Sequence, residues 1–297
     1  MAYTFDELLA LAEREAGGHD VPTRATIVKE LLHYDILLAL SRSEMGRRLV
    51  FQGGTALRLC YGGQRYSEDL DFVCGSDATE PFELGEVVDL LAQHVTRRYG
   101  LAIDVKPPGV DRQFSGEELV VKRWTVSIDV PGFAARQRIH VEVCNVPAYD
   151  PKPTLLQPRY DFLADVYSDI ALPVESLEEI AADKVVALLG RSHLKARDIW
   201  DLRWLDQRGI SIDPTLVCAK LDDYGLQDVE TRCEQAIARL RADDAPARFR
   251  EEMVRFVTPS VARRLLASPE SAQAWLTHAA RTLEHLAPTL AQPGPAP

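Results

Sequence analysis

Two acidic residues, Asp69 and Asp71, stand two positions apart in the segment Asp-Leu-Asp-Phe-Val-Cys. The alternation of polar and apolar residues over 69–74 predicts a half-buried strand, on which residues two apart project to one face. Two carboxylates on one face repel each other and suit a hard cation. Mg²⁺ takes one or two protein carboxylates together with substrate phosphates. Alone, the pair would fit a solvated strand face equally well.

A glycine pair precedes the two carboxylates. Residues 49–52 form a short apolar run that predicts a strand, and Gly53-Gly54 then leads into a short helix expected over 55–61. Glycines let backbone N–H groups approach a phosphate closely, and a helix N-terminus favours negative charge. The strand, glycine pair, helix and second strand together predict a site for a nucleotide and a metal ion.

Composition limits the class of protein. The chain has 297 residues, 46% apolar and 27% charged, which excludes a mostly disordered protein and suits two lobes. The net charge of −11 argues against general attraction to nucleic acid but is compatible with a local basic face. No apolar run approaches the ~20 residues that cross a bilayer, and the acidic start is unlike a secretory signal. We expect a cytoplasmic protein without membrane contact, whose five cysteines are reduced.

The elements that must position the site change character along the chain. Further strands are expected at 101–105, 119–130 and 138–146, which gives a sheet of about five strands, and helices are expected over 3–16, 23–41 and 81–99. Residues 147–173 are expected to be irregular because of their prolines, and only helical patterns follow. We therefore predict an α/β domain over 1–165 and a helical domain over 166–297, frayed from about residue 287.

The fuller string resembles a known family. Gly-Gly-Thr-Ala-Leu followed by Arg-x-Ser-x-Asp-Leu-Asp-Phe is similar to the AbiEii/MenT branch of the nucleotidyltransferase superfamily, whose members are toxins of bacterial toxin–antitoxin systems. The likeness covers residues 45 to 205. It implies the nucleotidyltransferase fold, a mixed sheet in an α+β N-terminal lobe followed by an all-helical C-terminal lobe.

The resemblance implies a third carboxylate on a later strand. Glu142, which alternates with valines in Ile-His-Val-Glu-Val, is preferred because this branch places an acidic residue in such a strand. Asp129, in Ser-Ile-Asp-Val, is the alternative. For each of them an outward-facing strand acid without a role is an equal alternative.

A later segment is similar to further motifs of the branch. The resemblance implies that the Lys184 ammonium neutralises triphosphate charge as a point cation, helped by Arg191 on nearly the same helix face. Asp198 and Asp201, three apart on an expected helix, would orient Lys184 or a bound base, or pair with Arg197. A solvated lysine and a surface ion-pair ladder are the alternatives.

Two residues just before the acidic pair complete the candidate site. Arg65 could bind a phosphate through two hydrogen bonds, and Ser67 could contact the triphosphate or serve as a modification site. The candidate catalytic residues are Asp69, Asp71, Lys184 and Asp198; the nucleotide-binding residues are Gly53, Gly54, Thr55, Arg65, Ser67, Lys184, Arg191 and Asp201; the metal ligands are Asp69, Asp71 and Glu142, with Asp129 as the alternative.

The implied reaction is transfer of a nucleoside monophosphate from an NTP, with pyrophosphate released and Mg²⁺ or Mn²⁺ as cofactor. The resemblance implies the tRNA 3′ end as acceptor, which would block aminoacylation and translation, and an antitoxin encoded nearby as partner. Segments 184–208 and 232–264 each carry a net charge of +3, which fits a basic RNA-binding face or an ordinary solvated surface. Transfer to a protein or small molecule, and nucleotide binding without turnover, are the alternatives; the oligomeric state stays open.

Overall fold

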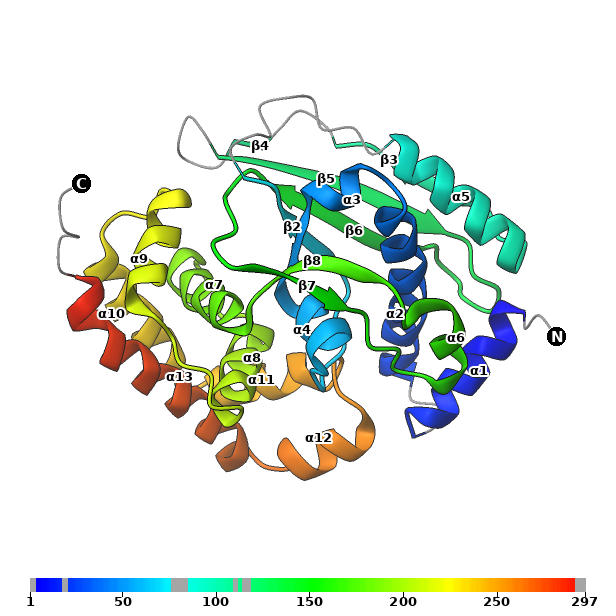
Figure 1. Cartoon of the computed structure of the whole chain (residues 1–297). Helices are drawn as coiled ribbons and strands as arrows, with labels where there is room; N and C mark the ends of the chain where they lie inside the picture. The colour runs from blue at the N-terminus through cyan, green and yellow to red at the C-terminus, as the bar shows by residue number, and fades with distance from the viewer. Residues whose placement is uncertain (1–3, 18–20, 76–84, 109–111, 114–118, 292–297) are drawn as a thin grey trace. The chain divides into compact units, whose positions relative to one another are not determined.

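The computed structural model describes residues 4–17, 21–75, 85–108, 112–113 and 119–291. The chain divides into two compact units, residues 1–175 and 176–297, each of which is described by itself (Figure 1). The boundary expected after residue 165 lies inside the first unit, because the strand at 171–175 hydrogen-bonds to the sheet of that unit.

The first unit is built on one mixed sheet. Its strands are β1 (Val50–Gln52), β2 (Leu70–Val73), β3 (Ile103–Lys106), β4 (Arg112–Gln113), β5 (Val120–Ile128), β6 (Gln137–Cys144), β7 (Pro151–Leu155) and β8 (Ala171–Glu175). The eight strands are ordered β3-β5-β6-β2-β1-β8-β7, with β4 paired to β5. The β2–β6 and β1–β8 pairs are parallel and the others antiparallel. The mixed α/β fold class is thereby confirmed.

All five expected strands are present, but the sheet is larger than expected. The prediction that 147–173 is irregular is wrong for β7, for the start of β8 and for the two short helices at 161–163 and 164–167. Pro151 and Pro153 are tolerated in β7 because this strand lies at the edge of the sheet, where a missing N–H need not break a ladder on both sides. The prolines therefore led the sequence analysis to miss an edge strand.

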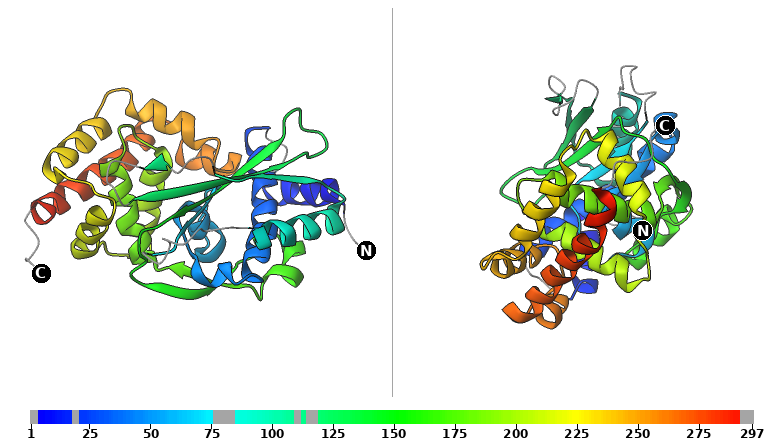
Figure 2. Two further views of the ribbon diagram at one scale, coloured as in Figure 1. Left: turned by 90° about the horizontal axis from the view of Figure 1, so that it is seen from above. Right: turned by 90° about the vertical axis from the view of Figure 1, so that its left-hand side faces the viewer.

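Helices cover one face of the sheet. They are α1 (Phe5–Glu15), α2 (Val21–Ser41), α3 (Met45–Arg48), α4 (Gly53–Tyr61), α5 (Gly85–Tyr99), the 3-10 helix η2 (Asp161–Leu163) and α6 (Ala164–Tyr167). Helix α2 contacts β6 and α5 contacts β3, and the two helices pack against each other on the same side of the sheet (Figure 2). Residues 81–84 of the expected third helix lie outside the described residues.

The apolar face of the sheet explains this layer. Phe51 and Phe72, paired across β1 and β2, stack with ring centroids 5.1 Å apart, and both are buried. Trp124 and Val126 of β5 continue the same buried face, as does Val141 of β6. Burying a side chain of this size contributes about 1.5–3 kcal/mol, so this face commits the strands to one register.

The second unit is helical, as expected. Its helices are α7 (Leu177–Gly190), α8 (Ala196–Gln207), α9 (Pro214–Asp223), α10 (Val229–Leu240), α11 (Ala245–Met253), α12 (Pro259–Leu265) and α13 (Pro269–Leu290). Trp200 and Trp275 stack in its core at 4.3 Å. Fraying from residue 287 is wrong for 287–290, because buried Leu286 and Leu290 hold the last turn of α13 despite Pro288; residues 292–297 lie outside the described chain.

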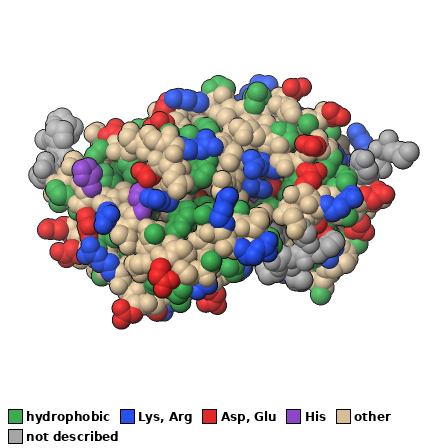
Figure 3. Space-filling view, turned by 90° about the horizontal axis from the view of Figure 1, so that it is seen from below, with side chains coloured by type: hydrophobic (Ala, Val, Ile, Leu, Met, Phe, Trp, Pro, Cys, Tyr) green, Lys and Arg blue, Asp and Glu red, His purple; other side chains and the backbone are tan. Residues whose placement is uncertain are grey.

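The surface is mixed in charge. Lysine and arginine side chains are interspersed with aspartate and glutamate over the face drawn in Figure 3. Within the described residues, no helix is both long enough and apolar enough to span a membrane. The described cysteines carry no disulfide, and burial raises the pKa of the Cys60 thiol to about 12, so this thiol stays protonated.

Candidate functional site

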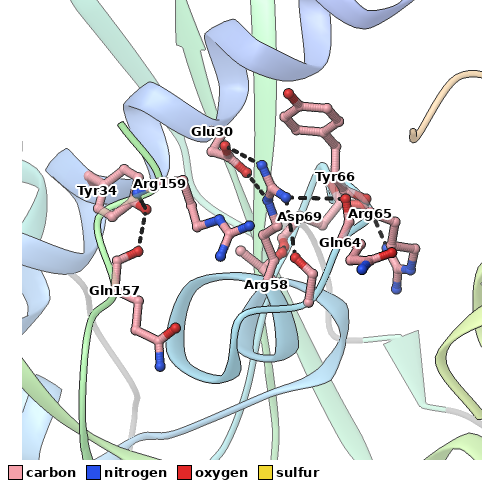
Figure 4. Close-up of polar contacts among 11 residues, drawn as sticks. Glu30, Tyr34, Arg58, Gln64, Arg65, Tyr66, Asp69, Gln157 and Arg159 are labelled. Carbon is pink, nitrogen blue, oxygen red and sulfur yellow. Dashed lines mark hydrogen bonds and ion pairs between the residues drawn. The ribbon is translucent and has the colours of Figure 1, made fainter. Parts of the chain in front are cut away.

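Residues 62–69 form the loop that carries the chain from α4 to the acidic strand β2. The Arg58 guanidinium of α4 donates hydrogen bonds to the carbonyls of Gly63 and Gln64, each at 3.2 Å. Glu30 of α2 accepts from the same guanidinium at 2.7 and 3.0 Å (Figure 4). Thr55 donates from Oγ1 to the carbonyl of Asp69. The start of β2 is therefore anchored to two helices.

Helix α2 holds the same loop from a second side. The Lys29 Nζ lies 2.7 Å from the Glu68 carboxylate, and the His33 Nε2 lies 3.1 Å from the Glu68 carbonyl. A carbonyl oxygen only accepts, so Nε2 carries the proton. Burial lowers the pKa of His33 to about 4, which keeps the ring neutral at neutral pH. Glu68, the neighbour of Asp69, is thus fixed through both side chain and backbone.

The glycine pair meets the acidic strand directly. Helix α4 begins at Gly53, two residues earlier than expected, and Gly53 has a φ of +77° that other residues rarely adopt. A Cβ on Gly53 would lie 2.9 Å from an Asp71 carboxylate oxygen. A Cβ on Gly54 would fall onto the Arg65 guanidinium, 2.9 Å from its Cζ. The glycines therefore let a carboxylate and a guanidinium lie against the backbone where α4 begins.

Strand register aligns further polar residues with Asp71. Asp71 is paired with Gln52 of β1 on one side and with Glu142 of β6 on the other, and Glu142 is paired in turn with Arg123 of β5. Paired residues on neighbouring strands share a face, so the four side chains form one row across the sheet. Asp69 immediately precedes β2, two residues before Asp71.

The two candidates for the third carboxylate are placed differently. Glu142 is the register neighbour of Asp71. Asp129 lies six positions beyond Arg123, the residue paired with Glu142, and so about 20 Å from Glu142 along the strand direction. The Asp129 carboxylate forms an exposed ion pair with the Arg136 guanidinium at 2.8 Å. The register brings Glu142, and not Asp129, to the acidic pair.

The donor set suits a hard divalent cation. Asp69 and Asp71 offer carboxylate oxygens, the ligands that Mg²⁺ and Mn²⁺ prefer, and Asp71 lies against the start of α4. Across the described part of the chain, no three His, Cys, Asp or Glu residues are grouped closely enough to hold a metal. Glu142 instead has its Oε1 2.6 Å from the Arg123 Nε. Two carboxylates with substrate phosphates therefore fit such an ion, while Glu142 would have to leave Arg123 to join them.

Arg65 and Ser67 are more enclosed than the sequence suggests. Arg65 is 4% exposed and donates to the Tyr66 carbonyl at 2.9 Å, with its guanidinium against Gly54. Ser67 is 6% exposed. Arg65 lies beside the helix start where a phosphate is expected, whereas modification of Ser67 would require the 62–69 loop to open.

The second unit gathers the remaining predicted residues into one buried cluster. The Lys184 Nζ lies 3.2 Å from Asp198 and 2.9 Å from Asp201, and Arg191 pairs with the other oxygen of Asp198. Lys184 is 7% exposed, so its charge is balanced inside the unit rather than solvated. Arg197 does not pair with either aspartate; its Nε lies 3.8 Å from Glu252.

Several anchoring residues were not identified from the sequence. The apolar pattern of α2 is interrupted by Lys29, Glu30 and His33. Because a buried polar side chain needs a partner, such an interruption indicates a polar contact on the buried face of the helix. Arg58 is likewise charged and buried in α4. In the second unit Lys220 is 1% exposed beside Glu179.

Comparison with known proteins settles the family. A model of the family described as nucleotidyl transferase AbiEii toxin, type IV toxin–antitoxin system, matches residues 35–288. The chain belongs to the AbiEii nucleotidyltransferase toxin family. It is accordingly an enzyme that transfers nucleotides and the toxin of a toxin–antitoxin pair. A search of curated proteins finds no match.

One solved structure supports the fold. The chain is similar to MenT4, a nucleotidyltransferase toxin from Mycobacterium tuberculosis, at a TM-score of 0.56 and 20% identity, covering 96% of this chain and 99% of that one. JHP933 from Helicobacter pylori gives a TM-score of 0.43 at 18% identity, covering 89% and 96% of the two chains. The first likeness extends the shared fold over nearly the whole length of both chains.

Proposed function

We propose that this toxin transfers a nucleoside monophosphate from an NTP to the 3′ end of an RNA, with tRNA as the acceptor, and that the reaction depends on Mg²⁺ or Mn²⁺. The observation that carries the proposal is the register pairing of Asp71 with Glu142, together with the contact of Asp71 with Gly53 at the start of α4.

In the first unit, carboxylates would bind the metal ion and backbone N–H groups would bind phosphate. Asp69 and Asp71 would hold the cation, with Glu142 as a third ligand once it leaves Arg123. When bound, the metal would lower the pKa of the attacking hydroxyl and stabilise the pyrophosphate leaving group. The backbone N–H groups at the start of α4 would bind phosphate oxygens, because a helix N-terminus carries unpaired donors and partial positive charge.

Arginines and the 62–69 loop would orient these groups. Arg65, held against Gly54 and the Tyr66 carbonyl, would place a fixed positive charge next to the phosphates. Thr55 donates its hydroxyl hydrogen to the Asp69 carbonyl and would so orient the start of β2, while its oxygen can still accept a hydrogen bond. The proposal gives the Lys184 cluster of the second unit a nucleotide-binding role: Asp198 and Asp201 orient the ammonium, and Arg191 adds charge.

Acceptor labelling tests the proposal. The protein is incubated with Mg²⁺, each α-labelled NTP in turn, and total tRNA, ribosomal RNA or a cell-protein fraction. We expect label on tRNA only, and none on tRNA whose 3′ terminal diol has been oxidised with periodate. Label on protein, on a small molecule or within periodate-treated tRNA would contradict the RNA 3′ end as acceptor.

Family membership implies an antitoxin counterpart, which we propose is encoded next to this chain. Expression of the toxin alone should arrest growth, and co-expression of the neighbouring gene should restore it. Harmless expression of an enzyme that is active in vitro would contradict this part of the proposal.

A further inference from the structure

The face that carries Asp71 continues along the sheet beyond the row of Asp71 and Glu142. In the next row, Lys106 of β3, Thr125 of β5 and His140 of β6 are register partners. One row further, Ser127 is paired with Asp104 on one side and Arg138 on the other. Side chains in successive rows share a face because they are two residues apart on each strand.

We call this surface the polar sheet face. Its members are Arg123, Thr125, Ser127, Arg138, His140, Glu142, Lys106 and Asp104, together with Asp69 and Asp71. Arg123, Lys106 and Arg138 are exposed, whereas Trp124, Val126 and Ile139 on the opposite face are buried. Thr125 and His140 are half-buried and Ser127 is buried, so the solvent-exposed part of the polar sheet face is formed by its charged side chains.

The charges of the polar sheet face are not all compensated. Arg123 pairs with Glu142, and Asp104 lies 3.7 Å from Arg136. Within the ranges that the structure describes, the side chains of Lys106 and Arg138 form no hydrogen bond or ion pair. Of the four carboxylates on this face, Glu142 and Asp104 are paired with arginines, and Asp69 and Asp71 would be offset by a bound metal ion. Lys106 and Arg138 then remain as unpaired cations further along the face that carries Asp71, a pattern complementary to a polyanion whose end must reach the metal.

The basic segments of the second unit offer less free charge than their composition suggests. In segment 232–264, three arginines donate to backbone carbonyls: Arg232, Arg239 and Arg250. Two more form ion pairs with carboxylates: Arg241 and Arg248. In segment 184–208 the Lys184 charge is buried between two aspartates. These six cations serve helix ends and internal pairs, so the number of basic residues overstates the charge left for a phosphate backbone. Arg263 and Arg264 of α12 are exposed and lie outside this set, which makes them the matched control below.

We propose that the polar sheet face binds the single-stranded 3′ segment of the acceptor RNA, with Lys106 and Arg138 contacting its phosphates and Thr125 and His140 between them offering hydrogen bonds to sugars or bases. The inference rests on the proposed function and adds where the acceptor lies. Arg138 stands four residues from Glu142, about 14 Å along β6, so the surface suits a few nucleotides leading to Asp71. Direct contact with exposed strands is a known mode of binding single-stranded RNA.

Salt dependence of RNA binding tests the inference. The probe is an oligoribonucleotide carrying the tRNA 3′ sequence, bound by the wild type and by the double variant Lys106→Gln/Arg138→Gln. Each phosphate contact to a single strand contributes about 0.7 to the slope of log K against log salt, so the slope should fall by about 1.4. We expect RNA affinity to weaken at least tenfold at low salt, with the KM for NTP unchanged. The matched control is Arg263→Gln/Arg264→Gln, two exposed arginines of α12, which should leave both quantities unchanged.

The outcomes separate the inference from the function on which it rests. An unchanged slope in the double variant, with RNA still labelled by the wild type, overturns the polar sheet face as the acceptor site and leaves the proposed function standing. An equal fall in the salt-dependence slope of the α12 control also overturns the inference, because the loss of any two surface cations would then weaken RNA binding to the same extent. Failure of the wild type to label or bind any RNA contradicts the proposed function itself.

Discussion

Replacing Arg58 with methionine should be among the most damaging single changes in the first unit. The guanidinium is 6% exposed and neutralises Glu30, which is 1% exposed, through hydrogen bonds of 2.7 and 3.0 Å. It also lies 4.4 Å from the centre of the Tyr66 ring and donates to the carbonyls of Gly63 and Gln64. The variant removes the cation and leaves a buried carboxylate behind.

The expected cost follows from that unpaired charge. Removing one partner of a buried ion pair costs about 3–5 kcal/mol, which for a unit of this size lowers Tm by about 6–20 °C. The double variant Glu30→Leu/Arg58→Met removes both charges and should recover most of this loss, since a buried pair can be exchanged for apolar residues at little cost. It does not restore a donor to the Gly63 and Gln64 carbonyls. We therefore expect stability to return in the double variant while nucleotide transfer stays low.

Urea unfolding and label transfer on the wild type, both single variants and the double variant form a complete cycle. A loss below about 1 kcal/mol in Arg58→Met would refute the reasoning about the buried pair. Full recovery of transfer in the double variant would refute the role assigned to the loop carbonyls.

Three other perturbations follow from the same contacts. Gly54→Ala should place a Cβ on the Arg65 guanidinium and raise the KM for NTP at least tenfold, whereas Gly85→Ala, whose Cβ meets nothing within 4 Å, should be silent in the same assay. Unfolding free energy should fall by about 3 kcal/mol as pH drops from 6.5 to 4, because the unfolded chain protonates His33 before the folded chain does; His33→Gln should flatten that part of a urea-midpoint titration. Lys184→Met should destabilise the second unit by about 3–5 kcal/mol in urea, since two buried carboxylates lose their shared cation; a change below about 1 kcal/mol would contradict this.

The candidate site could be predicted from the sequence where the position of a residue depends on its local pattern. Asp71 lies on β2 as the alternation predicts, whereas Asp69, expected on the same strand, is the last residue of the loop before it. The glycine pair could be identified for the same reason, since a strand that turns at once into a helix requires unusual backbone there. The family resemblance then supplied Glu142, and register places it beside Asp71.

The anchoring of the site was not predictable, because it depends on contacts between distant segments. Glu30 and Arg58 are 28 positions apart, and no local pattern specifies their meeting. The pairing of Arg123 with Glu142 requires the β5–β6 register, which tertiary packing sets. Segment 147–173 failed for a different reason: proline is a strong local signal against a strand, and only the edge position of β7 removes its cost.

The most direct test of the account is pyrophosphate release from NTP and tRNA by four single variants. Asp69→Asn, Asp71→Asn and Glu142→Gln remove the carboxylates of the proposed metal site, whereas Asp129→Asn removes an exposed carboxylate paired with Arg136. We predict at least a hundredfold loss for the first two, a clear but smaller loss for Glu142→Gln, and wild-type release for Asp129→Asn. Pyrophosphate release that persists in Asp71→Asn would contradict the assignment of the site. So would release that is lost in Asp129→Asn while Glu142→Gln keeps the wild-type rate.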